Sequence, residues 1–149
     1  MAAAQGIDAE FDQRPAPLTR VYETVIYAAD VRAVSAFYRD LLALVELATP
    51  DAWFAAFGLP DGATLLVFEP AASSAPGRDV PSHGAIGPGH VAFSVGARGL
   101  APWRERLRSY GIELEREVTW PSGASSLYCR DPAGNSVELV DGEIWAPAR

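Results

Sequence analysis

The chain lacks the features that mark secreted, membrane-spanning and nucleic-acid-binding proteins. It has one cysteine in 149 residues, so it can form no internal disulfide, and we expect a cytoplasmic protein. No apolar run approaches the ~20 residues that a membrane span needs. The formal net charge of −7 repels phosphate backbones and anionic lipids, which argues against nucleic-acid and membrane partners. We expect the single Cys129 to be a small packed residue rather than a nucleophile.

What the chain does have is enough apolar sequence for a substantial core, since 49% of its residues are hydrophobic. Residues 1–18 have neither a basic start nor a long apolar stretch, so they read as a flexible tail and not as a signal peptide. A stretch rich in Pro, Gly and Ser over residues 70–88 has no periodicity and reads as a linker. It separates two modules, over residues 19–69 and 89–141, and residues 142–149 form a C-terminal tail.

The first module opens with a strand near Arg20–Ala28, because β-branched and aromatic residues dominate there. Asp30 can cap the helix that follows. Apolar residues recur behind it at helical spacing and should form the buried face of that helix: Val31, Val34, Phe37, Tyr38, Leu41 and Leu42. Three more strands are expected, at Glu46–Thr49, Trp53–Leu59 and Ala63–Phe68.

The second module repeats this order of elements. A strand over 89–96 precedes an amphipathic helix over 99–111, with Leu100, Trp103, Leu107 and Tyr110 on one side. Three strands follow, within 113–120, 125–130 and 135–140, and "DPAGN" makes the last turn. Each half therefore reads as one strand, one helix and three strands, which predicts an α+β fold. The two modules can bury their sheets by pairing with each other.

Three side chains in this arrangement could bind a metal ion. Glu138 interrupts the apolar run "VELV", and a buried carboxylate needs a partner. Alternation along the first strand puts Glu23 on a mostly apolar face with Val25. His90 stands near the start of the equivalent strand in the second module. If the two sheets face one another, these three side chains can converge on one point.

At these positions the sequence resembles the vicinal oxygen chelate superfamily. That group includes glyoxalase I, extradiol dioxygenases, methylmalonyl-CoA epimerase, fosfomycin resistance enzymes and bleomycin resistance proteins. The segments that carry the resemblance are "YETVIYAADVRAVSAFYRDLLAL", "ATLLVFEP", "GPGHVAFSV" and "SLYCRDPAGNSVELV". The resemblance implies two paired βαβββ modules that form a curled, mostly antiparallel sheet around a shared cavity. It also implies a homodimer, with the modules paired within one chain or swapped between two.

The resemblance places metal ligands on the first and last strands of each module, which assigns Glu23, His90 and Glu138 to a divalent metal. The fourth position falls at Leu66, which cannot bind a metal, and we transfer no ligand role to Glu69. Three protein ligands leave coordination positions open for a chelating substrate. Two Glu and one His, where extradiol dioxygenases use two His and one Glu, leave Fe, Mn, Zn, Ni and Mg all open.

Two further residues are candidates for catalysis. His83 lies in the linker and is a general acid or base, a substrate contact, an extra ligand or a solvated loop histidine. Tyr128 either points into the cavity and polarises a bound oxygen or is an ordinary cross-strand aromatic. We expect four aromatic residues to line the cavity, its rim or the core: Trp53, Phe54, Phe68 and Trp120.

The function expected from this resemblance is that of a metal-dependent enzyme. Its substrate is a small molecule that chelates the metal through oxygens, and the reaction is a glyoxalase-type lyase or isomerase step or a dioxygenation. The alternative is a metal-free module that sequesters a drug or other ligand, as bleomycin resistance proteins do. In that case the carboxylates would find Arg or Tyr partners instead of a metal.

Overall fold

The computed structural model describes residues 15–145, so residues 1–14 of the expected N-terminal tail and 146–149 of the C-terminal tail lie outside it. The first half contains β1 (Glu23–Tyr27), α1 (Val31–Ala36), the π-helical turn η1 (Phe37–Leu41), β2 (Val45–Ala48), β3 (Phe54–Gly58), β4 (Thr64–Phe68) and α2 (Pro70–Ser74). The second half contains β5 (His90–Ser94), α3 (Ala101–Ser109), β6 (Arg116–Thr119), β7 (Ser125–Arg130) and β8 (Ser136–Asp141).

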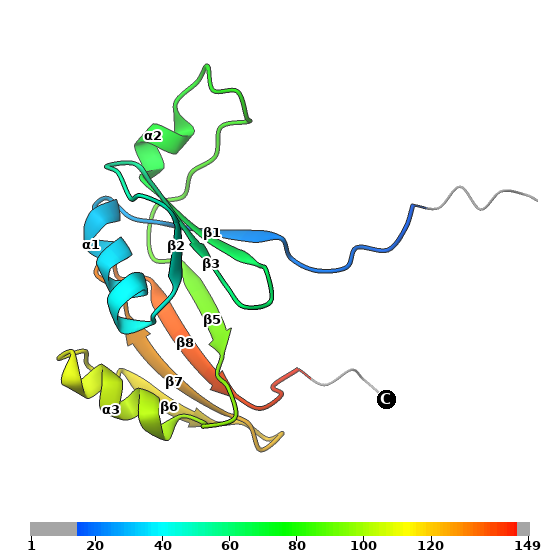
Figure 1. Cartoon of the computed structure of the whole chain (residues 1–149), viewed down its shortest axis with the longest axis vertical. Helices are drawn as coiled ribbons and strands as arrows, with labels where there is room; N and C mark the ends of the chain where they lie inside the picture. The colour runs from blue at the N-terminus through cyan, green and yellow to red at the C-terminus, as the bar shows by residue number, and fades with distance from the viewer. Residues whose placement is uncertain (1–14, 146–149) are drawn as a thin grey trace, which may run out of the picture.

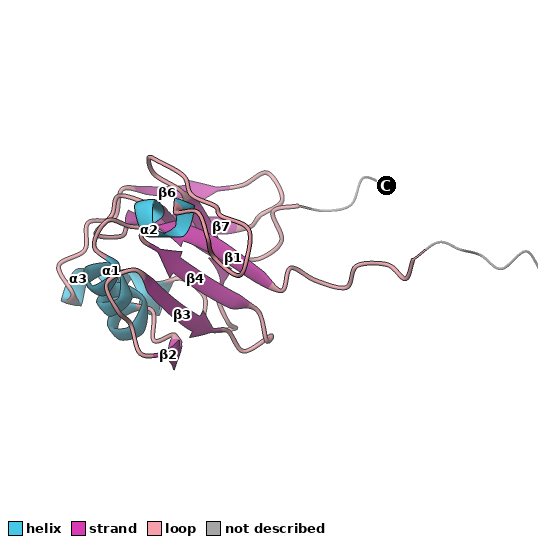
Figure 2. Cartoon of the chain, turned by 90° about the horizontal axis from the view of Figure 1, so that it is seen from above, coloured by secondary structure: helices cyan, strands magenta, loops and turns pink. Residues whose placement is uncertain are grey.

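The strands form two four-stranded sheets with the same topology. The first sheet has the order β1-β4-β3-β2 and the second the order β5-β8-β7-β6. In each sheet the first and last strands of the module pair in parallel, and the other pairs are antiparallel. The α+β fold of two βαβββ modules is therefore confirmed. Helices α1 and α3 lie on one side of the sheets, and the described ends of the chain leave on the other side (Figures 1 and 2).

The first helix forms where the apolar periodicity predicts it. The Asp30 carboxylate accepts a hydrogen bond from the Ala33 backbone at 3.0 Å and so satisfies one free donor of the first turn. All six residues of the predicted face are buried: Val31, Val34, Phe37, Tyr38, Leu41 and Leu42. They join one core with buried residues of both sheets, including Leu127 and Leu139 from the second module.

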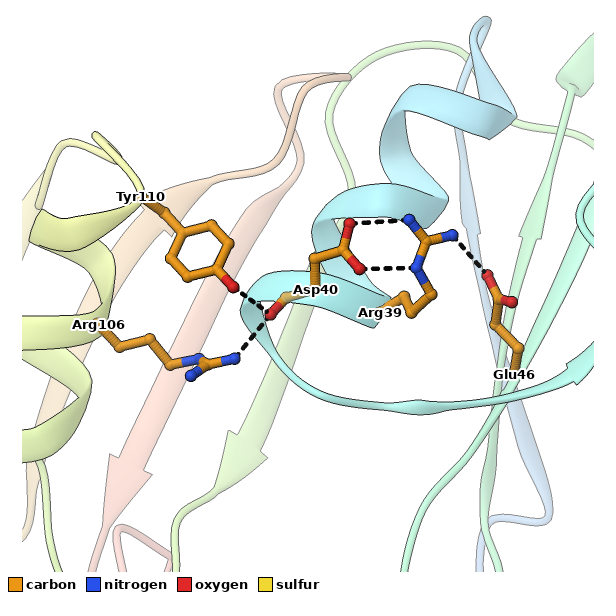
Figure 3. A network of polar contacts seen from close by, with 5 residues as sticks. All are labelled: Arg39, Asp40, Glu46, Arg106 and Tyr110. Atoms are coloured by element: carbon orange, nitrogen blue, oxygen red, sulfur yellow. Dashed lines mark hydrogen bonds and ion pairs between the residues drawn. The ribbon is translucent and has the colours of Figure 1, made fainter.

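The second helix packs less completely than its pattern suggests. Leu100 and Leu107 are buried, but Tyr110 is 49% exposed, which differs from a fully buried stripe. The reason is that Tyr110 lies at the end of the helix, beneath the Arg106 guanidinium, where its hydroxyl donates to the Asp40 carbonyl at 3.0 Å. Arg106 donates to the same carbonyl at 2.7 Å (Figure 3). These bonds join α3 to the end of η1 and so connect the two modules.

The linker contains a helix that the sequence pattern did not predict. Glu69 caps α2, because its carboxylate accepts hydrogen bonds from the Ala71 and Ala72 backbones at 3.1 and 2.6 Å. Pro70 occupies the first turn, where a missing N–H costs nothing. Glu69 therefore has a structural partner, and its place at the strand end needs no metal. Within residues 15–145, no helix combines the length and the apolar character that crossing a membrane requires.

Candidate metal site on the second sheet

The face of the second sheet opposite α3 is open and carries the candidate site. Strand pairing puts His90 beside Ser136, Ala92 beside Glu138, and Glu138 beside Tyr128. A cavity of about 520 Å³ lies over this face. Its lining residues come from β5, β7, β8 and the segment after β8: His90, Ala92, Ser94, Trp120, Tyr128, Glu138, Val140, Gly142, Glu143, Ile144 and Trp145.

Glu138 is a buried carboxylate with only part of its bonding capacity used. The residue is 5% exposed, and its Oε2 lies 3.3 Å from Nε2 of His90. Among residues 15–145, its Oε1 is the one buried side-chain polar atom without a hydrogen-bond partner. A buried unpaired acceptor costs about 1–3 kcal/mol, so it marks a place where a further partner belongs.

His90 is held so that one ring nitrogen faces this carboxylate. Its Nδ1 lies 3.2 Å from the Ser136 carbonyl oxygen, which can only accept, so Nδ1 carries a proton. In a neutral ring, Nε2 then presents a lone pair to Glu138, and the two acceptors repel unless a positive charge lies between them. A proton between the two side chains or a metal ion supplies that charge. Metal-binding histidines commonly donate their other N–H to a carbonyl in this way.

Tyr128 completes the group on this sheet. Its ring stacks on that of His90 with centroids 6.4 Å apart, and it is half-buried. Burial, together with the neighbouring Glu138 carboxylate, raises the pKa of the Tyr128 phenol. The phenol therefore stays protonated at neutral pH and is available as a hydrogen-bond donor. Leu127 and Cys129, which alternate with Tyr128, are buried in the core, as expected for Cys129.

Glu23 lies on the first sheet, and its side chain is exposed. Across the described part of the chain, no three His, Cys, Asp or Glu side chains lie close enough together to hold one metal ion. One chain thus brings two of the three predicted ligands together, His90 and Glu138, and leaves Glu23 apart from them.

The registers of the two sheets show which positions correspond. In the first sheet Glu23 pairs with Thr64, and Val25 with Leu66. In the second sheet His90 pairs with Ser136, and Ala92 with Glu138. Glu23 and His90 are therefore equivalent positions, as are Leu66 and Glu138. The register agrees with the placement of Leu66 at the fourth ligand position, where the side chain is a hydrocarbon.

The remaining predicted residues fall in two groups. Trp120 lines the cavity, whereas Trp53, Phe54 and Phe68 form an aromatic cluster on the first sheet, with ring centroids 5.0 to 5.8 Å apart. His83 contacts that cluster and not the cavity, since its ring packs edge-on against Phe68.

Sequence reasoning missed three residues that matter here. Ser136 orients His90 through its backbone carbonyl oxygen, and the identity of a residue does not indicate such a contact. Trp145 lines the cavity although it lies beyond the last predicted strand. Tyr27, which hydrogen-bonds His83 at 2.8 Å, could have been found, because it alternates onto the same face of β1 as Glu23.

Comparison with known proteins agrees with this architecture. The family model of the Glyoxalase/Bleomycin resistance protein/Dioxygenase superfamily matches residues 20–139. A crystal structure of lactoylglutathione lyase from Agrobacterium tumefaciens is 36% identical, with a TM-score of 0.82 over 89% of this chain and 100% of that chain. No curated protein matches the chain.

Two more distant structures share the fold. A glyoxalase/bleomycin resistance protein/dioxygenase from Nocardioides is 22% identical over 91% of each chain, with a TM-score of 0.67. Oxidase ChaP-H2 is also 22% identical, with a TM-score of 0.64 over 87% of this chain and 98% of that chain. The family match covers both modules and every candidate ligand. This chain belongs to the Glyoxalase/Bleomycin resistance protein/Dioxygenase superfamily.

Proposed function

We propose that this protein is a metal-dependent lyase or isomerase that acts on a small substrate chelating the metal through two oxygens. The observation that carries the proposal is the arrangement of His90. Its proton is directed to the Ser136 carbonyl, its free nitrogen faces Glu138, and Glu138 has a buried oxygen without a partner. The similarity to a lactoylglutathione lyase supports this reaction class.

We propose further that the site is completed by a second copy of the chain. His90 and Glu138 lie on the open face of the second sheet, and Glu23 is exposed on the first sheet, apart from both. In a homodimer in which the first sheet of one protomer faces the second sheet of the other, Glu23 of the partner subunit would be the third ligand. Each dimer would then hold two equivalent sites.

The residues of the chain have distinct tasks in such a site. His90 and Glu138 of one protomer, with the other protomer's Glu23, would hold the ion, which acts as a Lewis acid that stabilises negative charge on substrate oxygens. Tyr128 keeps its proton and donates a hydrogen bond to the oxygen on which charge develops. Trp120 lines the cavity and offers an apolar surface to the substrate.

Leu66 gives this site a different character from one with four protein ligands. A hydrocarbon at the fourth position leaves more coordination positions for substrate or water, as catalytic sites require. Two carboxylates and one imidazole form a mostly oxygen set, which suits Mn²⁺, Mg²⁺, Fe²⁺ or Zn²⁺. We therefore favour an enzyme that stabilises an enolate or oxyanion over an oxygenase.

The test is a titration of the purified protein with Mn²⁺ and with Zn²⁺, in which calorimetry measures the metal affinity. We expect Glu23→Gln, His90→Gln and Glu138→Gln each to weaken binding by at least about tenfold, since each removes a ligand. Glu46→Gln is the matched control, because Glu46 is a half-exposed strand carboxylate paired with Arg39. Equal affinity in all four variants would contradict the ligand assignment.

A second candidate function is sequestration of a ligand without metal. The observation that favours it is the exposure of two tryptophans at the cavity, where Trp145 is 86% exposed and Trp120 half-buried. In that case His90 carries the positive charge itself and forms an ion pair with Glu138. A titration that shows no metal binding in the wild-type protein would select this function over the first.

A further inference from the structure

The two histidines of the chain are held in opposite ways. His90 donates from Nδ1 to a backbone carbonyl, but His83 has its Nδ1 2.8 Å from the Tyr27 hydroxyl. The His83 backbone N–H also donates to the Ser73 carbonyl at 3.1 Å. Its ring packs edge-on against Phe68, with centroids 4.8 Å apart. Three contacts thus fix His83, which differs from a solvated loop histidine.

The chemistry of the pair decides which nitrogen carries the proton. A phenol O–H is a more acidic donor than an imidazole N–H, and within residues 15–145 the Tyr27 hydroxyl has no other hydrogen-bond acceptor. Tyr27 therefore donates to Nδ1, and the neutral ring carries its proton on Nε2. That nitrogen makes no hydrogen bond within the described residues, so it is a free donor.

The segment that carries His83 is anchored on both sides. The Arg78 guanidinium lies over the rings of Trp53 and Phe68, 5.4 and 5.6 Å from their centroids, and donates to the Ser73 carbonyl at 2.8 Å. Such cation–π contacts contribute about 0.5–1 kcal/mol each at accessible sites. Arg78 and His83 are therefore each held against aromatic residues of the first sheet, whereas residues 79–82 between them are exposed.

Tyr27 places this donor on the face of the first sheet that carries Glu23. The two residues alternate onto one face of β1 and lie four positions apart, about 13 Å along the strand. A molecule that extends from a metal beside Glu23 along this face would therefore reach Tyr27 and His83. A fixed N–H donor at that place suits an oxygen acceptor, such as a carboxylate or carbonyl.

We propose that Tyr27 is a positioning residue that fixes His83 as an Nε2–H donor, and that His83 binds an acceptor oxygen at the end of the substrate remote from the metal. This gives His83 one role among those the sequence leaves open and excludes ligation of the metal through Nε2. It also implies an extended substrate, whose chelating oxygens and acceptor oxygen are separated by a length comparable to the ~13 Å between the strand positions of Glu23 and Tyr27. The proposal rests on the function proposed above.

The tautomer can be measured without metal or substrate. ¹⁵N spectra of the two histidine rings would be recorded about two pH units above the ordinary histidine pKa of ~6.5. We expect His83 protonated on Nε2 with Nδ1 as a hydrogen-bonded acceptor, and His90 in the opposite form. In Tyr27→Phe the His83 Nδ1 resonance should move to that of a free imidazole. Tyr22→Phe, which removes an exposed hydroxyl from the same segment, should change neither histidine.

The donor role can be measured with two hydroxamates of equal length, which chelate through two oxygens. One ends in a carboxylate about 13 Å from the chelating group and the other in a methyl. With Zn²⁺-loaded protein we expect a preference of about tenfold for the carboxylate, the value of one hydrogen bond to a charged group. His83→Gln, which supplies an amide N–H, should retain the preference, and His83→Leu should lose it.

The outcomes separate the two proposals. An Nδ1–H form of His83, an unchanged His83 spectrum in Tyr27→Phe, or a carboxylate preference that survives in His83→Leu would overturn the role of Tyr27 and His83 while leaving the metal site intact. Failure of both hydroxamates to bind would overturn the metal site instead, because both chelate through the same group.

Discussion

Replacing Glu138 with leucine should stabilise the metal-free protein and abolish its response to metal. The register makes Leu66 the equivalent residue in the first sheet, so leucine already occupies this place once in the fold. The change removes a buried oxygen without a partner, which costs about 1–3 kcal/mol. It also removes the contact with His90, whose side chain is half-exposed, so that the pair contributes at most about 1 kcal/mol. With about 2 kcal/mol for the oxygen and up to about 1 kcal/mol for the lost contact, the expected net gain is about 1–2 kcal/mol.

For a chain of this size, 1 kcal/mol changes the melting temperature by about 2–4 °C. Thermal unfolding in chelator-treated buffer should therefore show Glu138→Leu melting about 2–8 °C above the wild type. Added Zn²⁺ should then raise the melting temperature of the wild type and not that of the variant. The reciprocal variant Leu66→Glu places a carboxylate on the half-buried equivalent position and should be less stable than the wild type. A Glu138→Leu protein less stable than the metal-free wild type would refute the reasoning.

Three further predictions concern a buried hydrogen bond, a strained backbone position and a buried thiol. Tyr38→Phe should lower the free energy of unfolding, measured in urea, by about 1.5–3 kcal/mol, since the fully buried Tyr38 hydroxyl donates to the buried Asp131 carboxylate at 3.1 Å. Tyr110→Phe, at a half-exposed position, should lower it by less than half as much. Equal losses of stability in the two variants would contradict this account of the Tyr38 bond. Ala43→Gly should stabilise the protein by about 0.5–1 kcal/mol in the same assay, because Ala43 has a φ of +56°, at which any residue with a Cβ is strained. A loss of stability would show that the backbone at Ala43 is unstrained. Burial, with Asp131 and Glu115 nearby, raises the pKa of Cys129 to about 11, so at pH ~8 only about a thousandth of the thiol is ionised. Alkylation of Cys129, followed by mass spectrometry, should therefore be slow in the native protein and fast once urea unfolds it. Rapid alkylation of the native protein would contradict this.

Much of the architecture could be predicted because it depends on local periodicity. The six apolar residues of the first helix and the alternation of Leu127 and Cys129 with Tyr128 follow from helix and strand geometry alone. Helix α2 was missed because its five residues have no amphipathic pattern. Its cap is Glu69, to which the sequence assigns neither a metal-ligand role nor another partner.

The candidate site was predictable in its residue types but not in its assembly. The apolar neighbours of Glu138 and the matching places of Glu23 and His90 can be read from the sequence. The sequence could not show that Ser136 orients His90 through its carbonyl oxygen, because backbone atoms are the same in every residue. It also could not show that Glu23 lies apart from the other two ligands, because that depends on how the two modules pack.

The most direct test of a site shared between two chains is subunit mixing. Glu23→Ala and His90→Ala homodimers each lack one ligand in both sites and should bind Zn²⁺ weakly. If Glu23 serves the partner's site, a mixed dimer of these two variants contains one intact site and one site that lacks both ligands. After unfolding and refolding the variants together, we expect tight Zn²⁺ binding to return at one ion per mixed dimer. No recovery of binding, with mixed dimers demonstrated by mass spectrometry, would contradict the shared site.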